Sequence, residues 1–184
     1  MGKIIVTEFV SLDGVYEDPH EWHFPFFLEQ AQQYKAAELR ATDALLLGRV
    51  TYEGFAQAWP ERSGDEFSDK FNAMPKHVVS TTLENPTWSN SHVVNANADL
   101  GAELGTLKDR YEQDIFIHGS GTLANSLLRQ GLIDEVRLMV HPIVVGKGRK
   151  FFEDGTSIPA LELADVTTWD GGIALMTYRP VGDA

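Results

Sequence analysis

The stretch that decides the fold is IFIHGSGTLA, residues 115–124, in which an apolar strand runs directly into a turn and a helix. Gly119 and Gly121 allow the backbone at this turn to approach a ligand closely, and the first amides of the helix can bind an anion. The G-x-G-x-x-A match is weak alone, because strand-to-helix junctions often use glycine for steric reasons. Two interpretations therefore stay open, a pyrophosphate site and a purely structural turn.

Ser120, in the middle of this turn, could instead suggest a serine hydrolase. The nucleophile turn of such enzymes needs a glycine two residues before the serine and another two residues after it. His118 and Thr122 stand at those positions, so the spacing disfavours a hydrolase.

Two further strands end in similar junctions. The run LLLGRVTY, residues 45–52, enters a helix through Gly48, and Arg49 then offers a planar fork for a phosphate. Thr51 can bind an anion, although a surface arginine and a simple helix cap remain the alternative. A third strand ends in the hydroxyl-rich run Ser80, Thr81 and Thr82. Because parallel strands deliver their carboxyl ends to one rim, we expect the three junctions to meet and to hold one nucleotide.

Outside these junctions, strands and helices alternate along the chain in the order that builds a mainly parallel sheet. We expect strands at residues 3–10, 43–47, 76–80, 91–94, 114–118, 135–145, 161–169 and 173–178. A helix opened by Pro25 and a capping box at Ser63-Gly64-Asp65-Glu66 are expected between them. Gly171-Gly172 favours a hairpin. The fold class is therefore α/β, with about eight mostly parallel strands, flanking helices and an antiparallel C-terminal edge, in one domain spanning residues 1–184.

Composition narrows the possible partners. The chain has 27 acidic and 15 basic residues, a net charge of −12, which disfavours nucleic-acid and membrane partners. It contains no cysteine, which excludes disulfides and Cys-ligated zinc and is compatible with the cytoplasm, where we expect the protein. The pair His20 and His23 lacks a convincing third ligand, so we expect no metal.

The segment from Val15 to Phe27 is rich in aromatic residues. Since it follows the first strand, it should lie near the ligand, and a flat heterocycle would stack against rings such as Trp22 and Phe26. A loop folded over its own core is the alternative.

Taken together, these landmarks resemble the dihydrofolate-reductase superfamily, and within it the branch that contains the reductase domain of bacterial riboflavin biosynthesis and its stand-alone relatives. The resemblance covers nearly the whole chain and rests on motifs that occur in the family's order: SLDGV at 11–15, LGRVTYE at 47–53, KHVVS at 76–80, HGSG at 118–121, LIDE at 132–135 and GKG at 146–148.

This resemblance implies an NADPH-dependent reductase that transfers a hydride to a heterocycle such as a pteridine or a 5-amino-6-(5-phosphoribosylamino)uracil. It implies that the cofactor is held by Val10, Ser11, Gly48, Arg49, Thr51, Ser80, Thr81, Thr82, Gly119, Ser120, Gly121, Thr122 and Leu123. Arg49 beside Thr82 would select the 2′-phosphate. Candidate catalytic carboxylates are Asp13 and Glu29, and candidate substrate contacts are Trp22, Phe26 and Tyr52. A homodimer formed through the C-terminal strands is also implied.

Three departures from the family limit what is carried over. Dihydrofolate reductases bind the pteridine ring through a carboxylate on the first helix, for which Glu29 is the nearest candidate and a solvated surface glutamate the alternative. Dihydrofolate reductases carry paired glycines where this chain has Gly119-Ser120, and the chain has neither the length nor the cysteines for the zinc deaminase domain of the riboflavin enzyme. The alternative function is an NADP-binding module without turnover.

Overall fold

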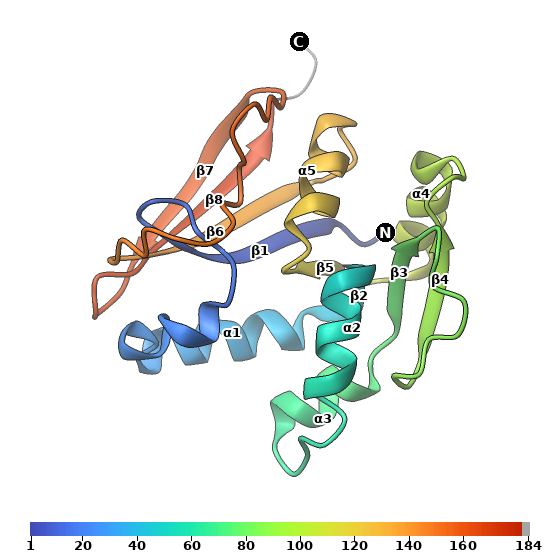
Figure 1. Ribbon diagram of the computed structural model, residues 1–184, viewed down its shortest axis with the longest axis horizontal. Helices are drawn as coiled ribbons and strands as arrows, with labels where there is room; N and C mark the ends of the chain where they lie inside the picture. Colours follow the sequence, from blue (N-terminus) through green and yellow to red (C-terminus); the bar gives the residue numbers. More distant parts are fainter. Residues whose placement is uncertain (182–184) are drawn as a thin grey trace.

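Eight strands form one sheet in the computed structural model, which describes residues 1–181 (Figure 1). Their order across the sheet is β4-β3-β2-β5-β1-β6-β8-β7. The strands are β1 (Ile4–Ser11), β2 (Thr42–Gly48), β3 (Lys76–Ser80), β4 (Ser91–Asn95), β5 (Asp114–His118), β6 (Glu135–His141), β7 (Leu161–Thr168) and β8 (Ala174–Pro180).

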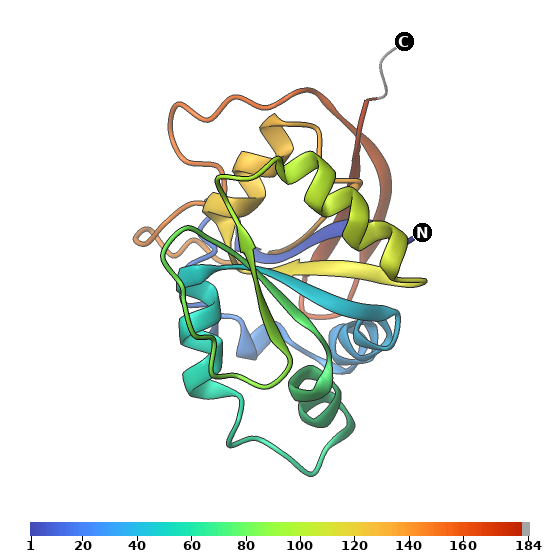
Figure 2. The ribbon, with the colours of Figure 1, turned by 90° about the vertical axis from the view of Figure 1, so that its right-hand side faces the viewer.

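Five helices cover the two faces of this sheet, α4 and α5 on one face and α1, α2 and α3 on the other (Figure 2). Their bounds are α1 (Glu29–Arg40), α2 (Arg49–Ala58), α3 (Glu66–Ala73), α4 (Leu100–Arg110) and α5 (Gly121–Arg129). Short 3₁₀ turns, η1 (Pro19–Glu21) and η2 (Phe24–Phe26), lie between β1 and α1.

The central strands are apolar throughout because both of their faces are covered. Along β1, Ile4 and Val6 pack against Leu104 of α4 and Leu127 of α5, whereas Ile5 belongs to the core on the opposite face. Side chains that alternate along a strand thus contribute to two separate cores. This arrangement fixes the register of the central strands.

The C-terminal edge is antiparallel, as predicted. Strands β6 and β8 pair antiparallel, as do β8 and β7, while β1 pairs parallel with both β5 and β6. Gly171 and Gly172 have positive φ angles of 85° and 83° in the hairpin between β7 and β8. The predicted α/β class with a mostly parallel sheet is confirmed.

Three predicted boundaries were wrong. The strand from Glu135 ends at His141 instead of residue 145, and Pro142, which has no N–H for a sheet, follows it. Pro25 lies within η2, and α1 begins only at Glu29. Asp65 caps α3 by accepting a hydrogen bond from the Ser68 amide at 2.9 Å, so the predicted capping box is replaced by a single cap.

Candidate functional site

A large cavity opens where the parallel strands β2, β3 and β5 end, beside the second half of β1. Its volume is about 1700 Å³, and it is bordered by the junctions that follow β2, β3 and β5. The structure therefore brings together the three junctions that lie far apart in the sequence. All the predicted residues of these junctions line the cavity: Gly48, Arg49, Thr51, Ser80, Thr81, Thr82, Gly119, Ser120, Gly121, Thr122 and Leu123.

Hydrogen bonds join the junction after β2 to the junction after β5. The Ser120 amide donates to Thr51 Oγ1 at 2.9 Å, and the Gly48 amide donates to Ser120 Oγ at 3.0 Å. Gly119 has a φ angle of 61°, and a Cβ placed on it would lie 3.0 Å from Thr51 Cγ2. The two hydroxyl groups thus hold the loops at a fixed separation, and glycine is the residue that fits between them.

The start of α5 faces the cavity and offers its amides. Ser120 precedes the helix without capping it through its side chain, which leaves the first N–H groups of α5 for an anion. Arg149 lies at the same place, donating from Nη2 to Thr122 Oγ1 at 2.9 Å. The Tyr16 ring covers Gly121, since a Cβ at Gly121 would lie 2.6 Å from Tyr16 Cζ. The helix start therefore carries both a dipole and a cation.

Arg49 and Ser80 also line the cavity, at the junctions that follow β2 and β3. Arg49 is exposed and donates from Nη1 to both carboxylate oxygens of Glu53, at 2.9 and 2.8 Å. Ser80 Oγ accepts hydrogen bonds from the amides of Thr82 and Leu83 and so shapes the turn after β3. The cation at this rim is thus partly satisfied by a neighbouring acid.

Two predicted cofactor contacts, Val10 and Ser11, do not line the cavity. They lie within the part of β1 that pairs with β6, where Ser11 is opposite His141, and both are buried. The cavity is instead bordered by the residues just before them, Thr7, Glu8 and Phe9. Val10 and Ser11 therefore lie two to three positions beyond the residues that border the cavity, because the register with β6 extends β1 past the rim.

The two predicted catalytic carboxylates also lie outside the cavity lining. Asp13 accepts hydrogen bonds from Ser11 Oγ, Gly146 N and Val145 N, and these bonds lower its pKa to about 2. Glu29 is exposed in the first turn of α1 and accepts a hydrogen bond from Gln33. Asp13 therefore anchors the turn after β1 to the loop after β6, and Glu29 is a surface residue.

The three predicted substrate contacts belong to the interior. Trp22 is buried and donates from Nε1 to the Glu17 carbonyl, and Tyr52 is buried with its hydroxyl accepting from the Trp88 amide. Phe26 packs beside the small core formed by Ala31, Met139, Ile173 and Leu175. Other aromatic residues line the cavity instead: Phe9, His23, Phe24, Phe27, Phe55, Trp59, Phe67 and Phe71.

A buried ion pair that the sequence pattern did not indicate lies beside the cavity. Lys35 of α1 forms an ion pair with Glu38 and donates to Thr7 Oγ1 at 3.1 Å. Glu38 also accepts from Tyr34 and from Arg137 Nη1, both at 3.2 Å. Burial opposes ionisation of Glu38, but Lys35 and the other neighbours outweigh it and lower the pKa. Lys35 thus lines the cavity and is paired with the buried carboxylate of Glu38.

Two histidines of the cavity lining, His118 and His23, are held in the neutral form near pH 7. Burial, reinforced by Lys35, lowers the pKa of His118 to about 3. Burial also lowers the pKa of His23 to about 4, with His141 adding to the effect. The rings of Phe9 and His23 stack with centroids 4.8 Å apart, so this part of the wall is flat and uncharged.

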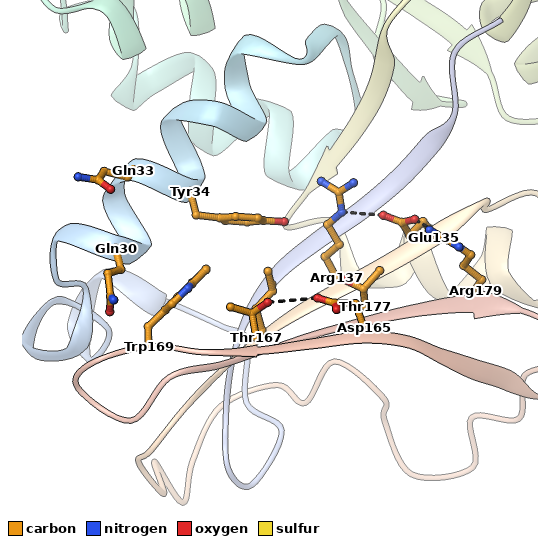
Figure 3. Close-up of a pocket in the computed structure, with 11 residues that line it drawn as sticks. Gln30, Gln33, Tyr34, Glu135, Arg137, Asp165, Thr167, Trp169, Thr177 and Arg179 are labelled. Carbon is orange, nitrogen blue, oxygen red and sulfur yellow. Dashed lines mark hydrogen bonds and ion pairs between the residues drawn. The ribbon is translucent and has the colours of Figure 1, made fainter.

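A second, smaller hollow of about 610 Å³ lies between α1 and strands β6, β8 and β7 (Figure 3). Its charged groups are paired with one another: Arg137 Nε donates to Glu135 Oε1 at 2.7 Å, and Arg179 Nε donates to Glu135 Oε2 at 3.1 Å. Thr167 likewise donates to Asp165 at 3.1 Å. None of the predicted cofactor residues lies here.

The sequence was compared with families and with individual proteins. Residues 2–175 match the model of the RibD C-terminal domain. The uncharacterized protein YyaP of Bacillus subtilis strain 168 is 26% identical, over 96% of this chain and 94% of YyaP.

Solved structures share the fold at lower identity. The Thermotoga maritima diaminohydroxyphosphoribosylaminopyrimidine deaminase/5-amino-6-(5-phosphoribosylamino)uracil reductase matches with a TM-score of 0.66 and 17% identity, over 98% of this chain and 57% of that one. The Enterococcus faecalis dihydrofolate reductase, in a complex with NADP(H), matches with a TM-score of 0.63 and 16% identity, over 97% and 96%. Within residues 1–181, no helix is both long and apolar enough to cross a membrane.

Proposed function

The chain belongs to the RibD C-terminal domain family, and from that premise we propose that it is a single-domain reductase that uses NADPH to reduce a heterocyclic substrate. The observation that carries this proposal is the convergence of three glycine- and hydroxyl-bearing junctions on one cavity. Ligand sites in such sheets lie at this edge. A cavity of about 1700 Å³ also exceeds the roughly 300–1,000 Å³ of a typical small-molecule pocket, which leaves room for a dinucleotide and a second ligand.

The residues present fit the phosphates of the cofactor. In a chain of net charge −12, an anion needs local donors, and the open start of α5 beside Arg149 supplies them for a pyrophosphate. Arg49, which lines the cavity together with Thr81 and Thr82, would bind the 2′-phosphate through its planar guanidinium group. Bound NADPH would supply the hydride.

The aromatic part of the cavity fits a flat heterocycle. Phe9 and His23 stack as an uncharged wall, and Phe27 lies beside both rings, 5.6 Å and 5.1 Å from them between centroids. Lys35 and Thr7 add polar groups at the edge of this wall. Stacking orients the substrate plane, and the polar groups can fix its rotation within that plane. A ribosylaminopyrimidine or a pteridine has this combination of a flat ring and polar edges.

An NADP-binding module without turnover is the second candidate. It is favoured by one observation, that Asp13 and Glu29 both lie away from the cavity lining. Turnover by this chain then requires another proton donor.

Binding and turnover can be measured separately. We expect NADPH to change the fluorescence of the protein, because Trp59 lines the cavity, and we expect addition of a ribosylaminopyrimidine phosphate or a dihydropteridine to consume NADPH. Binding without consumption across both substrates would support the module, and absence of NADPH binding would contradict both candidates.

A further inference from the structure

Glu8 is a buried acidic residue that lines the cavity. It lies on β1 between Thr7 and Phe9, lines the cavity, and is only 5% exposed. Its Oε1 atom is buried without a hydrogen-bond partner among the residues that the structure describes. Leaving such an atom unpaired is costly, and an unpaired buried polar group in a native protein calls for an explanation.

Among the other carboxyl groups at the cavity, Asp18 is exposed to solvent and the rest are already engaged. Glu38 is held by Lys35, Tyr34 and Arg137, while Glu17 and Asp99, which also line the cavity, accept hydrogen bonds from the amides of Arg149 and Ala102. Within residues 1–181, Glu8 is thus left with an unpaired carboxyl oxygen, Oε1, in the cavity where we propose that the ligand binds.

The surroundings of Glu8 favour its acid form. Burial raises the pKa of this carboxyl group well above the usual value, and the charge of Lys35 opposes the rise only in part. The other titratable or charged neighbours on this side are Tyr16, whose own pKa responds to Glu8, and Arg149, whose guanidinium group lies 5.9 Å from the centre of the Tyr16 ring. A carboxylic acid kept neutral by an apolar site can donate its proton.

We propose that the Glu8 carboxyl group is the proton donor in the reduction, an inference that rests on the proposed function. Bound NADPH would supply the hydride to the carbon of a substrate C=N bond and would thereby be oxidised to NADP⁺. The π electron pair of the C=N bond moves to the nitrogen. That nitrogen takes the proton of Glu8, whose O–H bond breaks, and the positive charge of Lys35 favours the resulting carboxylate. Water entering the open cavity then restores the proton.

Three histidines line the cavity, of which His20 is exposed. The other two are weaker candidates for this step than Glu8. His23 and His118 are neutral near pH 7, because burial lowers their pKa values to about 4 and about 3. A neutral imidazole is a far poorer acid than a carboxylic acid. Glu8 is therefore the group in the cavity lining that combines burial, a raised pKa and, among the described residues, an unpaired oxygen.

The test uses Glu8→Gln, which keeps the shape and removes the acid, and Glu162→Gln on the exposed strand β7 as a matched control. With a ribosylaminopyrimidine phosphate as substrate, we expect Glu8→Gln to lower kcat by about 10²- to 10⁴-fold. The affinity for NADPH, measured by fluorescence, should be nearly unchanged. The wild type should lose kcat as pH rises through the pKa of Glu8, and the variant should lack this decline. The control should behave as the wild type in all three measurements.

Two readouts do not need turnover. Infrared spectra near pH 7 should contain the C=O band of a protonated carboxylic acid in the wild type and the control, and that band should be missing in Glu8→Gln. The folded state also binds this proton more tightly than the unfolded state does, so Glu8 lowers stability as pH rises above about 4.5. The urea midpoint of Glu8→Gln should therefore exceed that of the wild type near pH 7.5, and the gap should close near pH 4.5.

The possible failures are distinguishable. If the wild type binds and consumes NADPH and a folded Glu8→Gln turns over equally fast, Glu8 is not the donor and the proposed function stands. An infrared band that persists in Glu8→Gln would also overturn the proposal. If the wild type neither binds nor consumes NADPH, the reductase function fails and the role of Glu8 fails with it.

Discussion

The cavity at the strand ends and the smaller hollow beside β6 and β8 both border α1, but they satisfy their polar groups in opposite ways. In the hollow, Arg137, Glu135 and Arg179 form a chain of ion pairs (Figure 3). The cavity instead leaves the start of α5 uncapped by a side chain and Glu8 Oε1 unpaired in the described part of the chain. Polar groups that already satisfy one another stabilise the fold, whereas unsatisfied groups around an opening indicate a ligand.

The two regions meet at a single carboxylate. Glu38 accepts from Arg137, which lines the hollow, and pairs with Lys35, which lines the cavity. Although burial alone would lower the pKa of Arg137, Tyr34 and Glu38 raise it, so this residue stays charged. Arg137 in the hollow thus holds Glu38, the counterion of Lys35 in the cavity, in place. We therefore expect substitutions in the hollow to change protein stability and substitutions in the cavity to change ligand binding.

The largest effect is expected for Arg137→Met, which breaks the chain of ion pairs in the hollow. It leaves the buried carboxylates Glu38 and Glu135 each short of a partner, and removal of one member of a buried pair costs about 3–5 kcal/mol. Urea unfolding should show this loss, while the NADPH affinity of the folded fraction changes little. Arg179→Met, which removes a more exposed partner of Glu135, is the control and should cost about 0–1 kcal/mol. Loss of NADPH affinity without loss of stability in Arg137→Met would contradict the distinction between the two regions.

A smaller effect on stability with a specific effect on binding is expected for Gly119→Ala. The φ angle of 61° disfavours any side chain, at about 1–2 kcal/mol, and the new methyl group would also press on Thr51. We expect weaker NADPH binding because Thr51 spaces the two loops through its bond to the Ser120 amide.

Gly131→Ala is the matched control for this change. Gly131 has a φ angle of 67°, has nothing within 4 Å of an added Cβ, and lies away from the cavity lining. It should lose similar stability and keep its NADPH affinity, as isothermal calorimetry can measure. Equal losses of affinity in both variants would show that the junction only shapes the fold.

The three junctions of the cavity could be predicted from the sequence, whereas the position of the rim along β1 could not. Glycine turns, the hydroxyl-rich end of β3 and apolar strands are local signals, and the rule that parallel strands end at one rim was enough to place the three junctions together. The position of the rim along β1 depends on its register with β6, which is set by pairing far away in the sequence. Val10 and Ser11 were therefore chosen in place of Thr7, Glu8 and Phe9.

The buried ion pair of Lys35 and Glu38 could not be predicted from the sequence, for a different physical reason. Lys35 and Glu38 stand three residues apart on α1 and have the pattern of an exposed helix face. Only tertiary packing against β1 and β6 buries them, and a charge is tolerated there because each has a partner. The aromatic loop was similarly ambiguous, since the η1 and η2 turns decide that Trp22 faces inward and Phe24 outward.

On the rim of the cavity, Arg49→Ala should change the choice between NADPH and NADH. A hydrogen bond to a charged group contributes about 1.5–3 kcal/mol, so NADPH affinity should fall by roughly ten- to a hundredfold. Only NADPH carries the 2′-phosphate, and NADH affinity should therefore change little. Fluorescence titration with both cofactors measures the ratio, and equal losses for the two would contradict the assignment of Arg49.

The smallest effect is expected for Glu53→Gln, on the partner of that arginine. Arg49 donates to both oxygens of Glu53, and the side chains are 43% and 44% exposed, so water screens the pair and its net strength is about 0–1 kcal/mol. A 2′-phosphate must compete with this carboxylate for the guanidinium group and also meets its negative charge. Removing the charge should therefore tighten NADPH binding by up to about fivefold, with no change for NADH. The gain should disappear in the double variant with Arg49→Ala, because Glu53 then has no cation to release. If the gain survived in the double variant, Glu53 would act by repelling the ligand directly, and the ion pair at the rim would have no part in cofactor selection.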